Sequence, residues 1–315
     1  MIENRLLISS LKFSVIIPVL NEEGNLVAIY TRLTKVMEDL EQSYEIIFVD
    51  DGSTDRSFQI LKDLHQKDSH IKVIRFTRNF GQNTARMAAL DCCKGENIIL
   101  MDADLQHQPE YIPKLLARLN EGYDIVYGVP RKRQDNLFKR VTSKAYIHLL
   151  AKLTGQDMNP NTSAFRVITR RVVTYIGQFR ETSPFFQGLI VWLGFPYAFV
   201  EVEHGRRHAG KTKYNLSKLI KLASEGILSF STIPLHLAGY LGFTVSIISF
   251  GIGTYMILKY LISGVAIHGY TSIIVSIFFL GGLTLIILWF MGLYISKIHV
   301  EVKKRPLYVI RDIIE

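Results

Sequence analysis

The sequence predicts an α/β domain built on a mostly parallel sheet, followed by two hydrophobic helices long enough to cross a membrane. Three observations lead to this prediction. Short β-branched apolar runs alternate with segments of helical periodicity through the first 120 residues. Carboxylate pairs directly follow two of these runs. The last third of the chain holds two long stretches without a charged residue.

The alternating units begin with Phe13–Pro18, a β-branched run, and Asn25–Leu40, in which apolar residues recur at helical spacing. Repeated units of strand and helix build a parallel, doubly wound sheet whose strand carboxyl ends carry the functional site. The expected strands are Phe13–Pro18, Tyr44–Val49, Ile71–Phe76 and Asn97–Met101, and the expected helices are Asn25–Leu40, Ser57–His65, Thr84–Cys92 and Pro109–Asn120.

The two uncharged stretches, Gly226–Leu258 and Tyr260–Ser296, each exceed the roughly 20 apolar residues that a helix needs to cross a bilayer. We expect spans at about 234–260 and 270–296, with a buried hairpin of a water-soluble core as the alternative. Basic residues precede the first span and follow the second, whereas the connecting turn carries only Lys259 near its start. This asymmetry predicts that the α/β domain and both termini are cytoplasmic.

The formal net charge of +9 fits either nucleic acid or an anionic membrane as a partner. Much of the excess lies beside the uncharged stretches, so lipid head groups are favoured and nucleic acid is not expected. The two cysteines, Cys92 and Cys93, are adjacent, which is typical of packing residues in a reducing compartment. The apolar run in Met1–Lys12 is too short for a secretory signal, so export of the domain is not expected.

Acidic residues, rather than glycine loops, follow the strands. Neither Gly-x-Gly-x-x-Gly nor Gly-x-x-x-x-Gly-Lys-Ser/Thr occurs, so no such loop binds phosphate at a helix N-terminus. Asp55, after the second strand, is expected to cap the next helix. Asp50 and Asp51 are expected to accept hydrogen bonds from a nucleobase.

A second acidic motif follows the fourth expected strand. Asp102, Asp104 and the amide oxygen of Gln106 are hard ligands suited to Mg²⁺ or Mn²⁺, which would bridge to a diphosphate. A solvated acidic turn is the alternative interpretation.

Four motifs together resemble the family 2 glycosyltransferases of the GT-A fold: Ile17–Glu22, Val49–Asp55, Arg78–Gln82 and Asp102–Gln106. The uncharged stretches narrow the resemblance to the polyisoprenyl-phosphate glycosyltransferases, such as dolichol-phosphate mannose synthases and bactoprenol glucosyltransferases, and it covers essentially the whole chain. The resemblance implies an inverting enzyme that transfers a hexose from a nucleotide sugar to a polyprenyl phosphate. The reaction would take place at the cytoplasmic face of a membrane, with a bacterial plasma membrane favoured.

The resemblance also implies which residues form the donor and metal sites. The nucleotide-sugar site would include Pro18, Leu20, Glu22, Asp50, Asp51, Gln82 and Asp102, and the metal site would consist of Asp102, Asp104 and Gln106, with Asp104 also catalytic.

On the acceptor side, Asp157 resembles the residue that orients the acceptor or acts as a base, with a loop or capping role as the alternative. Arg166 is suited to bind a phosphate through its planar guanidinium. Ala164 stands where the family commonly has glycine, and Thr212 replaces a serine of the family's basic loop. That loop would contact the diphosphate and the acceptor phosphate through Arg206, Arg207, Lys211 and Lys213.

The expected domain limits are 1–212 for the GT-A domain, 213–232 for an amphipathic helix at the membrane interface, 233–297 for the two spans and 298–315 for a cytoplasmic tail. The segment Arg131–Lys144 is either a second interfacial helix or a core helix. The tail Pro306–Glu315 is apolar and rich in strand-forming residues, so we expect it to pair with the α/β domain or with a neighbouring subunit of a homo-oligomer.

No pattern in the sequence identifies the sugar. UDP-glucose is favoured as the donor because the resemblance is strongest to bactoprenol glucosyltransferases, and GDP-mannose is the alternative. A processive polysaccharide synthase is disfavoured, since neither Trp192 nor Trp289 follows an arginine as in its Gln-x-x-Arg-Trp motif. A non-catalytic scaffold or flippase subunit would leave the metal-ligand set without a role.

Overall fold

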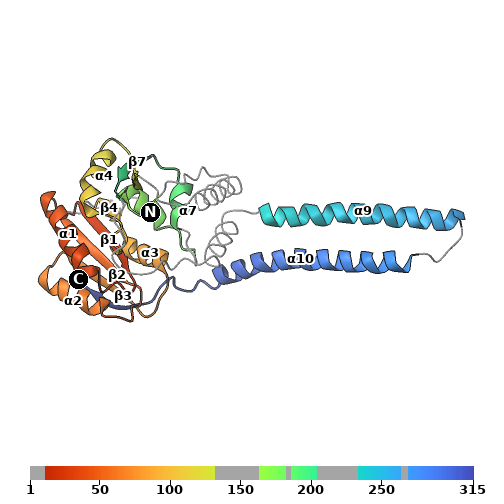
Figure 1. Cartoon of the computed structure of the whole chain (residues 1–315), viewed down its shortest axis with the longest axis horizontal. Coiled ribbons are helices and arrows are strands. Elements are labelled where there is room, and N and C mark those ends of the chain that lie inside the picture. Colours follow the sequence, from red (N-terminus) through yellow and green to blue (C-terminus); the bar gives the residue numbers. More distant parts are fainter. Residues whose placement is uncertain (1–10, 132–162, 182–185, 204–232, 264–268) are drawn as a thin grey trace. The chain divides into compact units, whose positions relative to one another are not determined.

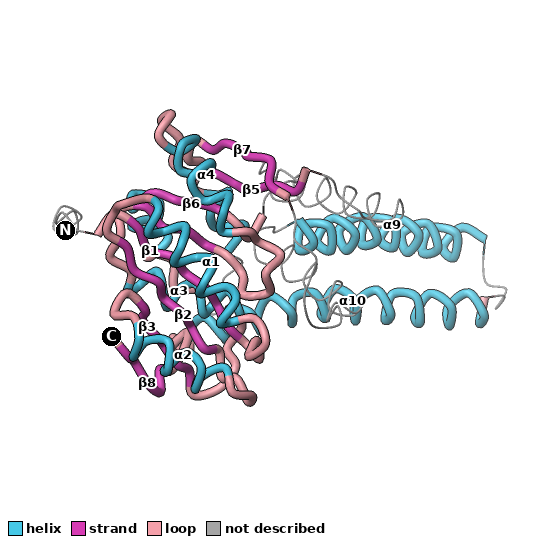
Figure 2. Tube along the Cα trace, turned by 60° about the vertical axis from the view of Figure 1, so that its left-hand side comes forward, coloured by secondary structure: helices cyan, strands magenta, loops and turns pink. Residues whose placement is uncertain are grey.

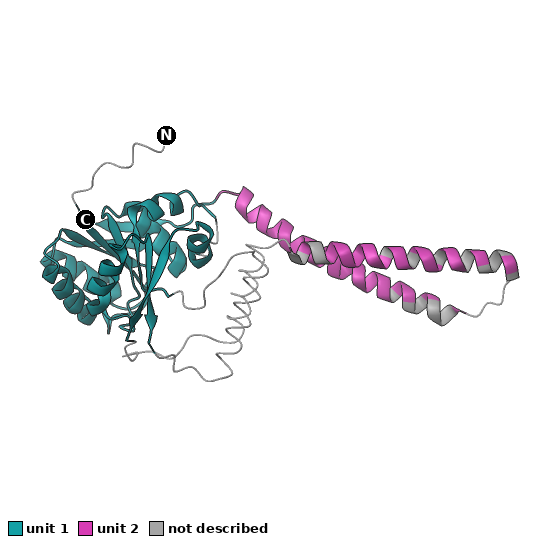
Figure 3. Ribbon diagram, turned by 90° about the horizontal axis from the view of Figure 1, so that it is seen from above, with its two compact units in different colours: residues 1–221, 305–315 teal, residues 222–304 magenta. Residues whose placement is uncertain are grey.

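The computed structural model describes residues 11–131, 163–181, 186–203, 233–263 and 269–315. The chain divides into two compact units, which Figure 3 distinguishes by colour. Residues 1–221 and 305–315 form the first unit, and residues 222–304 form the second. The predicted interfacial helix at 213–232 lies outside the described residues, as does the segment Arg131–Lys144 apart from its first residue.

The first unit is built on a sheet with the strand order β7-β5-β6-β4-β1-β2-β3-β8, eight strands within the described part of the chain. Neighbouring strands from β4 to β3 are parallel, whereas β6 runs antiparallel to both β4 and β5, and β8 runs antiparallel to β3. The strands are β1 (Phe13–Val19), β2 (Tyr44–Asp50), β3 (Ile71–Phe76), β4 (Asn97–Leu100), β5 (Ile125–Pro130), β6 (Arg166–Thr169), β7 (Tyr197–Val202) and β8 (Ile310–Ile314).

Helices cover both faces of this sheet, so the first unit has three layers (Figures 1 and 2). Successive residues of a strand point to opposite faces, and in β1 Val15 and Ile17 belong to one apolar core while Ile16 belongs to the other. One face carries α1 (Leu26–Asp39), α2 (Ser57–Lys67) and α4 (Ile112–Leu119), the last preceded by the short 3-10 helix η2 (Pro109–Tyr111), and the other carries α3 (Gln82–Cys92), α6 (Arg170–Ile176) and α7 (Phe186–Trp192).

Burial on both faces explains why the central strands are mostly apolar along their whole length. All seven residues of β1 and all seven of β2 are buried, as expected for parallel strands between two helical layers. The four strands and four helices predicted before residue 120 are confirmed, with the last helix divided between η2 and α4. The mostly parallel α/β prediction is therefore correct.

The C-terminal tail forms β8 and completes one edge of the sheet beside β3. The aromatic ring of Tyr308 stacks on that of Phe76, with ring centroids 5.3 Å apart, and its hydroxyl donates a hydrogen bond to Asp91. The tail therefore pairs with the α/β domain, which is one of the two arrangements predicted for it.

The second unit contains α9 (Ile233–Ser263) and α10 (Tyr270–Val302). Among the described residues, the segment Phe279–Val302 is long and apolar enough to cross a membrane, with a mean hydropathy of 2.0, and Ala238–Ile252 is a shorter apolar segment. Gly242 allows close packing of the two helices, since a Cβ atom there would lie 3.1 Å from Cδ1 of Ile287. By length and composition, the described residues thus contain one candidate span, and the pair of spans stays a prediction.

Candidate active site

The carboxyl ends of β1, β2, β3 and β4 lie at one edge of the sheet, because these strands are parallel. The antiparallel strand β6 begins at this edge, where its first residue, Arg166, is the register partner of Leu100. Residues from motifs far apart in the sequence therefore meet here. The described members of the predicted site at or just beyond this edge are Pro18, Leu20, Glu22, Asp50, Asp51, Gln82, Asp102, Asp104, Gln106 and Arg166.

The loops after β1 and β2 are joined by reciprocal hydrogen bonds. Asn21 donates its backbone N–H to Ser53 Oγ at 3.0 Å, and its side-chain oxygen accepts the N–H of Thr54 at 2.8 Å. Asn21 has a φ of +55°, which asparagine tolerates better than most residues. The carboxylate of Asp55 accepts the N–H groups of Ser57 and Glu23, so it closes the start of α2 and ties that start to the first loop.

Asp50 is fully buried at the end of β2. One carboxylate oxygen, Oδ1, accepts the N–H of Ser53 at 3.0 Å. The other, Oδ2, lies 3.4 Å from Nε of Arg75 and has no hydrogen-bond partner among the described residues. A buried carboxylate oxygen without a hydrogen bond is costly, so a donor from a bound molecule would stabilise it.

Asp51 holds the loop of the third motif against β2. Its two carboxylate oxygens accept the N–H groups of Phe80 at 2.7 Å and Gly81 at 3.0 Å. Burial raises the pKa of Asp51 and the neighbouring Asp50 adds to this effect, although the two backbone hydrogen bonds act in the opposite direction. The same contact requires glycine at Gly52, where a Cβ atom would lie 2.6 Å from the carbonyl carbon of Arg78.

Asp102, just after β4, is the centre of a charged cluster. Its Oδ1 accepts a hydrogen bond from Nη2 of Arg86 at 2.8 Å and another from Nε2 of Gln82 at 2.6 Å. Burial would raise the pKa of Asp102, but the positive charges of Arg86 and Arg166 help to hold it below its usual value. The carboxylate therefore stays ionised and is oriented through one of its oxygens.

The turn that follows is ordered by local contacts. Asp104 accepts the backbone N–H of Gln106 at 3.1 Å, and Leu105 between them has a φ of +60°. His107 is buried, its ring stacks on Phe165 with centroids 5.3 Å apart, and its Nδ1 accepts the backbone N–H of Asp102 at 3.0 Å. Since Nδ1 acts as an acceptor, the ring proton belongs on Nε2.

The residues of this turn fit a hard divalent cation. Asp102 and Asp104 supply carboxylate oxygens, Gln106 supplies an amide oxygen, and both hydrogen bonds from Gln82 and Arg86 fall on one oxygen of Asp102. Among the described residues, no group of three or more His, Cys, Asp or Glu side chains is gathered to hold an ion. Mg²⁺ commonly uses one or two carboxylates and completes its shell with water and substrate phosphates, so this donor set suits it.

Arg166 lies almost completely buried at the start of β6, with a relative exposure of 2%. Its guanidinium carbon is 5.3 Å from the ring centre of Tyr127 and 5.6 Å from that of Phe186. Its Nε and Nη1 have no hydrogen-bond partner among the described residues. A buried guanidinium with unused N–H groups can bind an anion edge-on, through donors that lie in one plane.

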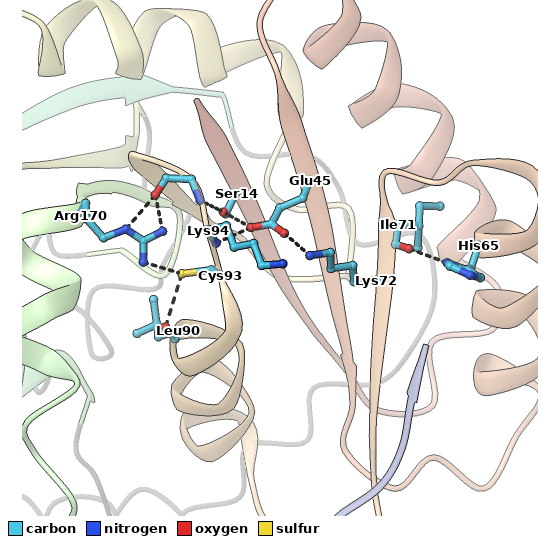
Figure 4. Close-up of polar contacts among 10 residues, drawn as sticks. Ser14, Glu45, His65, Ile71, Lys72, Leu90, Cys93, Lys94 and Arg170 are labelled. Carbon is cyan, nitrogen blue, oxygen red and sulfur yellow. Dashed lines mark hydrogen bonds and ion pairs between the residues drawn. The ribbon is translucent and has the colours of Figure 1, made fainter. Parts of the chain in front are cut away.

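A second buried polar cluster lies at the amino ends of the strands, opposite the site (Figure 4). The carboxylate of Glu45 accepts hydrogen bonds from Ser14 Oγ at 2.6 Å and from the backbone N–H of Lys94, and it pairs with Lys72 at 2.8 Å. Nearby, Arg170 donates to the carbonyl of Gly95 and to the sulfur of Cys93. Because its groups are paired with one another, we interpret this cluster as structural.

Several predicted site residues lie outside the described residues: Asp157, Arg206, Arg207, Lys211 and Lys213. The structure also adds residues that the sequence did not indicate. Arg75 approaches Asp50, Arg86 binds Asp102, and His107 fixes the backbone of Asp102. A charged residue among the small apolar residues of α3 was the available signal for Arg86.

Comparison with known proteins identifies the family. The model described as "Glycosyl transferase family 2" matches residues 14–180. The chain belongs to glycosyl transferase family 2. It is 40% identical over 305 residues to an uncharacterized glycosyltransferase of Synechocystis sp., covering 96% of each chain. It is 38% identical over 304 residues to a prophage bactoprenol glucosyl transferase homolog of Escherichia coli K12, covering 96% of this chain and 99% of the relative.

Among solved structures, this family 2 chain matches the glucosyl-3-phosphoglycerate synthase of Mycobacterium tuberculosis in complex with Mn²⁺, UDP and phosphoglyceric acid. The match covers 69% of this chain and 76% of that one, with 23% identity and a TM-score of 0.49. Membership of the family establishes that the protein is a glycosyltransferase enzyme with the GT-A type of α/β sheet, as the motifs predicted.

Proposed function

We propose that this enzyme transfers a hexose from a nucleotide sugar to a polyprenyl phosphate, with glucose from UDP-glucose as the favoured reaction. The observation that carries the proposal is the near full-length similarity to relatives named bactoprenol glucosyl transferase, which includes the hydrophobic C-terminal part as well as the α/β domain. A relative that shared only the donor site would not extend the similarity through α9 and α10.

The donor nucleoside binds at the ends of β1 and β2 in this proposal. Oδ2 of Asp50 supports this role, because it is buried and lacks a hydrogen bond, whereas the ring N–H of uracil is a donor. Pro18, Leu20, Glu22 and Asp51 complete the pocket, and Gln82 and Asp102 extend it toward the diphosphate. Asp51 also holds the loop that leads into Gln82, the first residue of α3, so part of its contribution is positional.

The transfer is an in-line displacement at the anomeric carbon of the sugar. An oxygen of the polyprenyl phosphate forms the new bond, while the bond from the anomeric carbon to the diphosphate breaks and the nucleoside diphosphate leaves. The configuration inverts, and no covalent enzyme intermediate forms. Since a lipid phosphate is ionised at neutral pH, Asp157 positions the acceptor more than it deprotonates it, and Arg166, Arg206 and Arg207, with Lys211 and Lys213, hold the two phosphate groups.

Asp102, Asp104 and Gln106 would hold Mg²⁺ or Mn²⁺. When bound, the ion neutralises the charge that develops on the departing diphosphate. Arg86 helps to keep Asp102 ionised, and Arg86 and Gln82 together orient its carboxylate for that role.

We also propose that α9 and α10 both span the membrane, joined by an interfacial helix at 213–232 to a cytoplasmic catalytic domain. Large apolar side chains along both helices are exposed, among them Ile262 of α9 at 83% and Leu285 of α10 at 69%. So much exposed apolar surface on a helix pair is stable in lipid and not in water. The membrane would then be a bacterial plasma membrane, and a homo-oligomer is the favoured assembly.

The experiment that tests the proposal is sugar transfer by the purified full-length enzyme in detergent. The donors are labelled UDP-glucose, other UDP-sugars and GDP-mannose, the acceptor is polyprenyl phosphate, and Mg²⁺, Mn²⁺ or a chelator is added. We expect an acid-labile labelled lipid from one donor, and its loss with the chelator and in Asp104→Ala. If only GDP-mannose labels the lipid, the transferred sugar is mannose and not glucose. If no donor labels the lipid, the proposal is refuted.

A further inference from the structure

Arg86 occupies an unusual place for an arginine. It lies on α3 between Ala85 and Met87, and the face of the helix around it belongs to the apolar core. Its side chain is only 7% exposed, yet among the described residues it donates only two hydrogen bonds, one to Asp102 and a longer one to Asn83 at 3.2 Å. A buried charge of this kind is retained only where the structure or a ligand compensates for the lost water.

The charges in this part of the site do not balance. Among the described residues, two buried guanidinium groups, Arg86 and Arg166, accompany the carboxylate of Asp102. Burial is the main cause that lowers the pKa of Arg166 to about 10. The positive charge of Arg86 lowers this pKa further, whereas Tyr127 and Asp102 raise it. Within the described part of the chain, the cluster therefore has an excess of positive charge, carried by two buried side chains.

Unused hydrogen-bond donors accompany this excess charge. Nε of Arg86 and both Nε and Nη1 of Arg166 are buried without a partner among the described residues. The ion pair with Asp102 gives a hydrogen-bond partner to Nη2 of Arg86, but to none of these three atoms. Buried polar atoms are nearly always hydrogen-bonded in native proteins, so three unpaired donors on two neighbouring cations point to an anion that completes them.

We propose that Arg86 and Arg166 form a fixed anion site that binds the diphosphate of the donor without requiring a metal ion. The inference rests on the proposed function and deepens it, because it adds a residue on α3 to the diphosphate site and gives the two arginines a role separate from that of Asp104 and Gln106. Asp102 is then shared: its ionised carboxylate orients Arg86 and also partly neutralises the site until an anion arrives.

The test measures binding of inorganic pyrophosphate to the full-length enzyme in detergent by calorimetry, with excess chelator present. Arg86→Gln removes the charge and is expected to weaken binding about 10- to 100-fold, the range for one or two charge-assisted hydrogen bonds. Arg86→Lys keeps the charge without the planar group and is expected to bind with intermediate affinity. Arg180→Gln is the matched control, since it removes another arginine that is paired with an aspartate, Asp91, and it should bind as the wild type does.

A further variant gives a change of opposite sign. Asp102→Asn removes the negative charge beside the arginines, so chelator-resistant binding of pyrophosphate should become stronger, by about tenfold. An arginine pair with a purely structural role predicts no such gain. This variant also keeps the proposal testable if Arg86→Gln does not fold, which a thermal unfolding scan of each protein would reveal.

Three results would overturn the proposal: no binding of pyrophosphate to the wild type in chelator, equal affinity in folded Arg86→Gln and wild type, or weaker binding in Asp102→Asn. Failure of the proposed function has a different signature. In that case the wild type would bind pyrophosphate as described, while no lipid product formed from any nucleotide sugar in the transfer assay.

Discussion

Replacing Asp51 by alanine tests how the site is assembled from separate loops. The carboxylate of Asp51 is 2% exposed and accepts the N–H groups of Phe80 and Gly81, at 2.7 and 3.0 Å. A hydrogen bond to a charged group contributes about 1.5–3 kcal/mol, but burial of the carboxylate offsets part of this, and water can reach the partly exposed loop. We therefore expect Asp51→Ala to lower the free energy of unfolding by about 2–3 kcal/mol.

The assay is thermal unfolding of the full-length protein in detergent, combined with the KM for the nucleotide sugar. For a domain of this size, a loss of that magnitude lowers the Tm by about 5–10 °C. The KM should also rise, because the freed loop leads directly into Gln82, the first residue of α3, which donates to Asp102 at 2.6 Å.

Asp55→Ala is the control, since Asp55 also accepts two backbone N–H groups but holds the start of α2 instead. It should lower the Tm less, because Asp55 is partly exposed. An unchanged Tm and KM in Asp51→Ala would refute the reasoning.

Three further changes have expected outcomes. Asp104→Ala should reduce the rate of sugar transfer by about 10²-fold or more while the unfolding temperature stays near that of the wild type, as expected for loss of charge stabilisation; retained transfer would contradict its role. Glu45→Gln should lower stability without changing the KM for the nucleotide sugar. Burial alone would raise the pKa of Glu45, but the interactions with Lys72, Ser14 and Lys94 outweigh it, so the net pKa in the folded state is lowered. The contribution of Glu45 to folding stability is therefore present above the unfolded pKa of about 4.3 and is lost as the pH falls through the folded value. Equal acid sensitivity of mutant and wild type would contradict this. Deletion of residues 308–315 removes β8 and the stacking of Tyr308 on Phe76, so the Tm in detergent should fall, and an unaltered Tm and molecular mass would show that the tail stabilises neither the fold nor an assembly.

The sheet could be predicted from the sequence because its signals are local. Strands such as β1 (Phe13–Val19) are rich in β-branched apolar residues and are followed by a helical pattern, and all seven residues of β1 are buried between the two helical layers. The acidic motifs were found for the same reason, since Asp50 and Asp102 stand directly after strands. The tail was predicted to be a strand, but the sequence did not identify β3 as its neighbour in the sheet. That pairing joins residues more than two hundred positions apart, as does the hydrogen bond from Tyr308 to Asp91 of α3.

The site could be predicted only in part, because several of its contacts are long-range. Asp51 bonds to the backbone of residues about thirty positions away, and no local pattern distinguishes that role from nucleobase binding. Arg86 reaches Asp102, sixteen positions further along the chain, only because α3 packs on β1 and β2 and the loop after β4 comes close to it in three dimensions. The basic residues of the acceptor side, including Arg206 and Lys211, lie outside the described residues and stay predictions.

The central claim, transfer of a hexose to a lipid phosphate, is tested most directly by mass spectrometry of the acceptor. The purified enzyme is incubated with UDP-glucose, a divalent cation and polyprenyl phosphate, and the lipid and the released UDP are measured in the same reaction. The account predicts that the lipid gains the mass of a single hexose and that UDP appears in equal amount. An unchanged lipid in a reaction that nevertheless consumes UDP-glucose would contradict it, since the sugar would then have gone to another acceptor.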